Sequence, residues 1–108
     1  MADGEHAALD DVRAIIRHIT SLTHETNVDL GKAISMSPAL VGRRQSSQSK
    51  WSVDELARVA AHWGLDLWCL FTDVDRVMHE LPQDRVTELR AAKGLAPLHF
   101  KPPMPVAA

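Results

Sequence analysis

The chain has 108 residues, which is enough for one domain with one modest hydrophobic core. Hydrophobic residues make up 45% and charged residues 24%, as in an ordinary globular protein, and the net charge of −2 argues against a uniformly basic, histone-like nucleic-acid binder. A single cysteine, Cys69, excludes an internal disulfide and any zinc site that needs two or more cysteines.

The N-terminal sequence is acidic and lacks the order of a signal peptide, and no apolar stretch approaches the ~20 residues of a membrane span. We therefore expect a cytoplasmic protein with no membrane partner. Cys69 lies in an apolar run, Leu67–Phe71, and is predicted to be a small core residue.

The charged residues are distributed unevenly along the chain. Residues 1–29 carry two arginines against six acids, whereas residues 30–53 carry four basic residues and no acid. Residues 54–108 carry six basic residues and eight acids. A basic window in an acidic chain lets a protein approach phosphates in one orientation. The alternative is a solvated loop that is basic by chance.

A first helix is predicted from Asp10 or Asp11 to about Ser21. Its apolar residues recur at helical spacing and form one stripe: Val12, Ile15, Ile16, Ile19 and Leu22. Three polar residues lie off this stripe: Arg13, Arg17 and His18.

Two short helices joined by a tight turn are predicted next. Thr26 or Asn27 can cap a helix that ends near Ile34, and its expected inward residues are Leu30, Ala33 and Ile34. Ser37 is a good N-cap and Pro38 suits the first helical position, so the following helix is predicted over Pro38–Gln45. Its inward residues are Val41 and Arg44, and a polar loop follows at 46–50.

Ser52 and Glu55 form a capping box that predicts the start of a fourth helix, with Trp51 and Leu56 placed as a hydrophobic staple. The inward face of this helix comprises Leu56, Val59, Ala60 and Trp63, and Gly64 ends it in the left-handed conformation. Asp66 opens a fifth, short helix that turns Leu67, Leu70 and Phe71 inward. All three tryptophans, Trp51, Trp63 and Trp68, are predicted to be core or staple residues rather than platforms for base stacking.

The remaining sequence predicts one or two helical turns at 73–81 and a last helix from Pro82 to Lys93, closed by Gly94. This helix has only Val86 and Leu89 as apolar positions, so it packs on the main domain or meets a partner. No segment alternates with period two, which makes the predicted fold all-α. The predicted divisions are a main domain at 7–72, a helical extension at 73–94 and an extended, Pro-rich tail at 95–108.

The order and spacing of these elements resemble the Cro and lambda-repressor type (XRE-like) helix-turn-helix family over Val12–Thr72. The best-matching stretches are VDLGKAISMSPALV at 28–41 and Ser52–Phe71. The resemblance implies a lambda-repressor-like five-helix bundle, followed here by the extension and the tail. Gly31 suits the close approach of the two short helices. Ser35 stands where the family usually has a glycine in the left-handed conformation.

In that family, the helix that corresponds to Pro38–Gln45 enters the major groove of DNA. The resemblance implies base contacts from Pro38, Ala39, Gly42, Arg43 and Ser46. It implies phosphate contacts from Asn27, Lys32, Arg44, Gln45, Gln48, Ser49 and Lys50. Alternatively, Arg43 is a solvated arginine, Arg44 points toward the first helix and pairs with an acid, and Asn27 only caps its helix.

The predicted function is a sequence-specific regulator of transcription that binds double-stranded DNA, of the phage-repressor type, acting as a homodimer on two half-sites. The predicted dimer contact is the extension at 73–94. The alternatives are an antitoxin-type autoregulator and a protein-interaction domain whose DNA-binding face has decayed.

The six histidines are scattered, no nucleophile elbow surrounds a serine and no glycine loop cradles a phosphate, so no enzyme, metal or cofactor is expected. The ending Val106-Ala107-Ala108 is similar to the small apolar endings that bacterial ATP-dependent proteases recognise. Some short immunity repressors of temperate actinobacterial phages carry such a tag, and the alternative is a featureless tail.

Overall fold

The computed structural model describes the backbone of residues 2–98 and the side chains of residues 10–98. All regular elements in this part are helices, which confirms the all-α prediction. They are α1 (Ala2–Thr23), α2 (Asn27–Ile34), α3 (Pro38–Gln45), α4 (Val53–His62), the 3₁₀ helix η1 (Leu67–Phe71), α5 (Val74–Glu80) and α6 (Gln83–Ala92). None of the helices within 2–98 combines the length and apolar character needed to cross a membrane.

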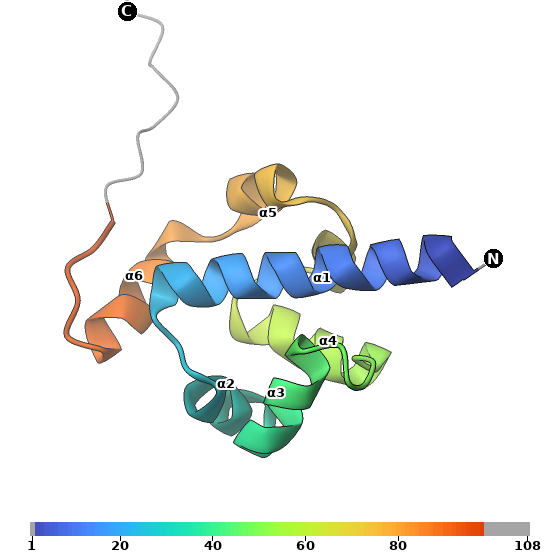
Figure 1. The fold of residues 1–108 in the computed structure, drawn as a ribbon. Coiled ribbons are helices and arrows are strands. Elements are labelled where there is room, and N and C mark those ends of the chain that lie inside the picture. Colours follow the sequence, from blue (N-terminus) through green and yellow to red (C-terminus); the bar gives the residue numbers. More distant parts are fainter. Residues whose placement is uncertain (1, 99–108) are drawn as a thin grey trace, which may run out of the picture.

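The long helix α1 runs across the middle of the molecule, with α2, α3 and α4 on one side and α5 on the other (Figure 1). It begins at Ala2, well before the predicted start, because strong helix formers such as Ala7 and Ala8 precede Asp10. Val12, Ile15, Ile16 and Ile19 of the predicted stripe are buried. Arg13, which lies off this stripe, is also buried.

The predicted bounds of α2 and α3 are confirmed, and the turn between them is tight. The amide of Met36 donates to the carbonyl of Gly31 over 2.8 Å, and Ser35 adopts the left-handed conformation with φ 62°. A Cβ at Gly31 would lie 2.4 Å from the Met36 carbonyl oxygen, so only glycine fits there. Ser37 caps α3 by accepting from the amide of Leu40. Ala33 was predicted to face inward but is exposed.

The capping box of Ser52 and Glu55 starts α4 as predicted, and Gly64 ends it with φ 72°. The inward face of α4 is buried as predicted. The next element is a 3₁₀ helix, in which Cys69 and Leu70 are buried. Burial raises the pKa of the Cys69 thiol.

Two predictions for η1 are wrong, because Trp68 is 50% exposed and Phe71 is 47% exposed. A 3₁₀ helix has three residues per turn, so residues 68 and 71 point to the same side. That side faces away from the core, because the two residues between them, Cys69 and Leu70, are the ones buried in the core.

The predicted extension packs on the main domain. Val77 of α5 and Val86 of α6 are each 1% exposed and belong to the same core as Val12 of α1. The core therefore does not divide at residue 72. The non-helical segment at 95–98 brings Leu98 against this core. The rest of the predicted tail, including Val106-Ala107-Ala108, lies outside the described residues.

We predict that Gly31→Ala lowers the free energy of unfolding by about 2–3 kcal/mol, because the added methyl group collides with backbone at Met36. Gly42→Ala is the matched control in α3, since its Cβ would only touch the end of the Asn27 side chain, at 3.4 Å. Urea unfolding of both variants tests this. Equal effects of the two substitutions would show that the turn does not require glycine at 31.

Candidate nucleic-acid interface

The five predicted base-contact residues share one face of α3. Pro38, Ala39, Arg43 and Ser46 are exposed and Gly42 is half-buried, whereas Val41 on the opposite side is 0% exposed. The Ser46 hydroxyl donates to the carbonyl of Arg43, which ties it to the end of the helix. Arg43 is the charged residue of this face, and no acid occurs between residues 30 and 53.

Asn27 lies beside this face rather than serving as the cap of α2. The N-cap is Thr26, whose side chain accepts from the amide of Asp29, so the alternative that Asn27 only caps its helix is wrong. The position of a Cβ on Gly42 is 3.4 Å from the Asn27 amide nitrogen. The first turn of α2 and the exposed face of α3 therefore meet at this pair.

The structure divides the predicted phosphate-contact residues into two groups. The side chains of Asn27, Lys32, Gln48 and Lys50 are exposed. The other three predicted residues, Arg44, Gln45 and Ser49, are partly buried and form polar contacts inside the molecule.

Arg44 forms a bidentate ion pair with Glu55 of α4, with Nε–Oε1 at 2.9 Å and the second nitrogen–oxygen distance at 3.0 Å. It also donates to the Ser49 hydroxyl at 2.5 Å. The alternative that Arg44 pairs with an acid is therefore correct, although the acid is on α4 and not on α1. The Arg44 hydrogen bonds lower the pKa of Glu55 to about 2.

Arg13, a residue without a predicted role, connects α1 to the end of α3. Its Nε donates to the carbonyl of Arg44 at 2.8 Å and another guanidinium nitrogen donates to the carbonyl of Ser49 at 3.2 Å. Gln45, the last residue of α3, adds a second link to α1, because its side chain donates to the carbonyl of Arg13. The same side chain accepts from the indole of Trp51. The one available signal was that α3 lacks a C-terminal glycine cap and leaves its last carbonyls in need of donors.

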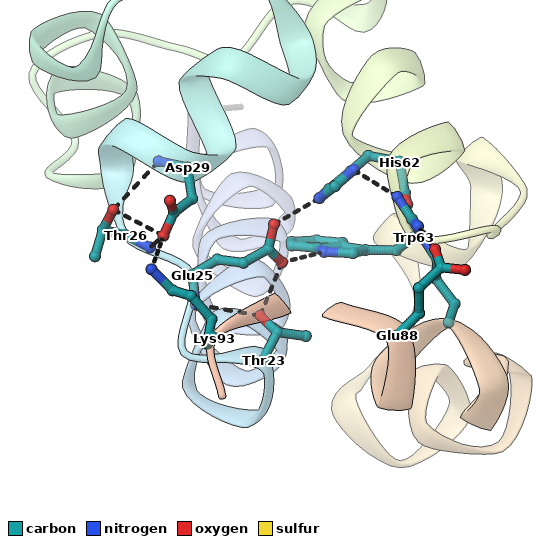
Figure 2. A network of polar contacts seen from close by, with 9 residues as sticks. Thr23, Glu25, Thr26, Asp29, His62, Trp63, Glu88 and Lys93 are labelled. Atoms are coloured by element: carbon teal, nitrogen blue, oxygen red, sulfur yellow. Dashed lines mark hydrogen bonds and ion pairs between the residues drawn. The ribbon is translucent and has the colours of Figure 1, made fainter. Parts of the chain in front are cut away.

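A second network fixes the connection between α1 and α2 (Figure 2). The Glu25 carboxylate accepts from the Thr23 hydroxyl and the Trp63 indole, both at 2.8 Å, and lies 2.5 Å from Nε2 of His62. Burial alone would raise the pKa of Glu25, but the hydrogen bonds from His62, Trp63 and Thr23 outweigh it and the pKa is lowered. An Arg85 guanidinium nitrogen lies 3.1 Å from Nδ1 of His62. Because guanidinium only donates, Nδ1 accepts and Nε2 carries the proton toward Glu25.

Three basic residues of α6 and its C-terminal end connect the extension to the rest of the fold. Arg85 donates to the last carbonyl of α4 at 2.7 Å, and Arg90 donates to a carbonyl near the end of α1 at 2.6 Å. Lys93 pairs with Asp29 in the first turn of α2 at 2.6 Å, as Figure 2 shows. The Lys93 contact lowers the pKa of Asp29 to about 2. The extension thus helps to hold the start of α2.

Comparison with known proteins does not distinguish DNA binding from the alternative functions. No family model, curated protein or solved structure matches the chain. Among the described residues, no three metal-ligating side chains converge on one point. The function is therefore argued from the exposed face of α3 and its surroundings.

We predict that the Arg44–Glu55 pair makes stability depend on acid pH. Because the folded-state pKa of Glu55 is about 2 and its ordinary value is 4.5, the stabilisation is complete above about pH 5 and is lost as the pH falls toward 2. Glu55→Gln is expected to lower the free energy of unfolding at pH 7 and to flatten its decline in that window.

Urea unfolding at several pH values between 7 and 2 measures this effect. Asp54→Asn removes an exposed carboxylate from the same turn of α4 and is the matched control. If Glu55→Gln declines with pH as steeply as the control, the ion pair does not contribute to the acid sensitivity.

Proposed function

We propose that the protein is a sequence-specific regulator of transcription that binds double-stranded DNA, of the phage-repressor type, with a lambda-repressor-like helix-turn-helix. The observation that carries this proposal is the exposed face of α3, which bears Arg43, lacks acids and adjoins Asn27 at the start of α2. In this proposal α3 enters the major groove, and the protein works in the cytoplasm of a bacterial host.

Arg43 is the residue that reads a base most directly, because a guanidinium can donate two hydrogen bonds to guanine. Ala39 can contact the methyl group of a thymine, whereas Pro38 and Gly42 offer shape without a side-chain hydrogen bond. Part of the specificity therefore comes from the shape of the DNA. The exposed residues Asn27, Lys32, Gln48 and Lys50 contact the phosphates.

The internal networks support recognition by keeping α3 in place. Base readout needs a helix that is held within a few tenths of an ångström, and a helix of eight residues is not stable alone. Arg13 and Arg44 connect the end of α3 to α1 and α4. In this proposal, these two arginines position α3.

An antitoxin and a protein-interaction domain are the competing functions. The exposed pair Trp68 and Phe71 favours a protein contact of some kind, but it lies on η1 and leaves the face of α3 available. A protein contact therefore adds to DNA binding rather than replacing it.

We predict that selection from a randomised pool of duplex DNA enriches a roughly palindromic site. Arg43→Ala is expected to cost about 1–3 kcal/mol at one base pair of each half-site, because it removes a bidentate contact. Lys32→Ala is expected to weaken binding at all sequences and to reduce the salt slope by about 1. Binding is measured at two salt concentrations for each variant.

Arg17→Ala is the matched control, since Arg17 is an exposed arginine on α1. If no sequence is enriched even at low salt, where attraction to phosphates is strongest, the proposal is wrong. It is also wrong if Arg43→Ala and Arg17→Ala have the same effect on binding.

A further inference from the structure

The 3₁₀ helix η1 carries an exposed aromatic ridge, which we define as the side chains of Trp68 and Phe71. Both rings are about half exposed and point to the same side of η1. The other two tryptophans, Trp51 and Trp63, are buried. Aromatic side chains are enriched at protein interfaces relative to the rest of the surface, so the ridge is a candidate contact surface.

The ridge is held rigidly by the core beneath it. The residues between the two rings, Cys69 and Leu70, are buried, and the Thr72 hydroxyl donates to the carbonyl of Cys69 at 2.7 Å. A rigid aromatic surface loses little conformational entropy when a partner covers it.

Exposed carboxylates flank the ridge at both ends of η1. Residues 66–80 carry four acids against one arginine. Asp66 directly precedes η1, Asp73 and Asp75 follow shortly after it, and all three are exposed. Within the described part of the chain, none of these three carboxylates takes part in an ion pair. Their charge is therefore available to a partner.

Arg76 shows that the ridge accepts a guanidinium. Its guanidinium carbon lies 5.8 Å from the centre of the Trp68 ring, within the range of a cation–π contact. Its Nε lies 3.5 Å from Oε1 of Glu80, so the fourth acid balances the charge of this arginine. The Trp68 side chain is still half exposed beside Arg76, which leaves room for a second cation.

We propose that the aromatic ridge, with the carboxylates of Asp66, Asp73 and Asp75, binds an arginine-bearing basic segment of another protein. An arginine of that segment stacks on an exposed ring and pairs with a carboxylate beside it. Arginine suits this surface better than lysine, because its planar guanidinium stacks on rings and pairs with carboxylates.

The charge of the surface excludes two other partners. Nucleic acid does not fit, because the three carboxylates repel its phosphates. A second copy in ridge-to-ridge contact does not fit either, because it would bring two sets of unpaired carboxylates together, and like charges across an interface are costly. A basic segment is the partner that the ring and the carboxylates both attract.

The ridge is separate from the exposed face of α3. Helix α5 lies on the opposite side of α1 from α2 and α3 (Figure 1), and α4 packs against both α2 and η1. The basic partner and DNA therefore bind at different places and do not compete. The inference does not depend on DNA binding, since no residue of the ridge belongs to the face of α3.

The test uses the whole chain and three labelled synthetic peptides, in which serine alternates with arginine, lysine or glutamate. Fluorescence anisotropy at two salt concentrations gives the affinity of each peptide. Acrylamide quenching locates the contact, because Trp68 is the exposed tryptophan. Circular dichroism establishes that each variant is folded.

Two variants alter the surface in different ways. Trp68→Ser removes a ring, and Asp66→Asn combined with Asp75→Asn removes two charges without removing a cap, since Asp66 makes no capping hydrogen bond with its side chain and Asp73 is the cap of α5. The matched controls are Val53→Ser and Asp54→Asn, which alter an exposed apolar and an exposed acidic residue at the start of α4.

We expect the arginine peptide to bind at least about tenfold more tightly than the glutamate peptide, and more tightly than the lysine peptide. Trp68→Ser should weaken its binding by about three- to thirtyfold, the range of one cation–π contact. The double Asp→Asn variant should weaken binding and reduce its dependence on salt. Both controls should bind as the unaltered protein does, and the arginine peptide should protect Trp68 from acrylamide.

Four results would overturn the inference. The arginine peptide fails to bind, or binds no more tightly than the glutamate peptide. It binds both ridge variants as tightly as it binds the unaltered protein. Trp68 becomes protected from acrylamide when the protein alone is concentrated, which would show that a second copy covers the ridge. Trp68 is already protected in dilute protein, which would show that the chain itself covers the ridge.

Discussion

The arrangement of the short helices depends on Arg13 of α1. Helix α3 ends without a glycine cap, and its last carbonyls need donors that the helix cannot supply. The buried guanidinium of Arg13 supplies a donor to the carbonyl of Arg44 in the last turn of α3 and another to the carbonyl of Ser49 in the loop that follows. A buried acceptor that loses its donor costs about 1–3 kcal/mol, which is a large part of the stability of a small domain. The exposed face of α3 has a fixed direction because this contact holds its end to the longest helix.

The start of α2 depends on a comparable set of contacts from α4 and α6. Glu25 receives donors from both residues at the end of α4, and Lys93 pairs with Asp29 inside the first turn of α2. The extension is therefore structural. Its basic residues occupy carbonyls and carboxylates of the other helices, and its apolar residues complete the core.

Local signals in the sequence predicted the short helices, whereas tertiary contacts decided the rest. Caps act within four residues, so Ser37 with Pro38 and Ser52 with Glu55 set the starts of α3 and α4. The buried role of Arg13 depends on carbonyls more than 30 residues away, and the missing glycine cap of α3 does not indicate which residue supplies the donor. The exposed rings of η1 were missed for another reason. A period of 3.6 residues turns position 71 inward, but a period of three turns it outward. The residues of the candidate site were implied by the resemblance to the helix-turn-helix family, whereas the partner of Arg44 required the position of Glu55.

The small size of the exposed face of α3 limits what one copy can contribute to the proposed function. One good bidentate contact discriminates against a wrong base by about 1–3 kcal/mol, and the exposed face of α3 offers one arginine for such a contact. Specific DNA binding exceeds non-specific binding by about 4–10 kcal/mol in typical regulators. A single copy with one arginine and a few small residues does not reach that difference by direct readout. Two copies double the number of base contacts, and a weak contact between them is sufficient when the DNA brings them together.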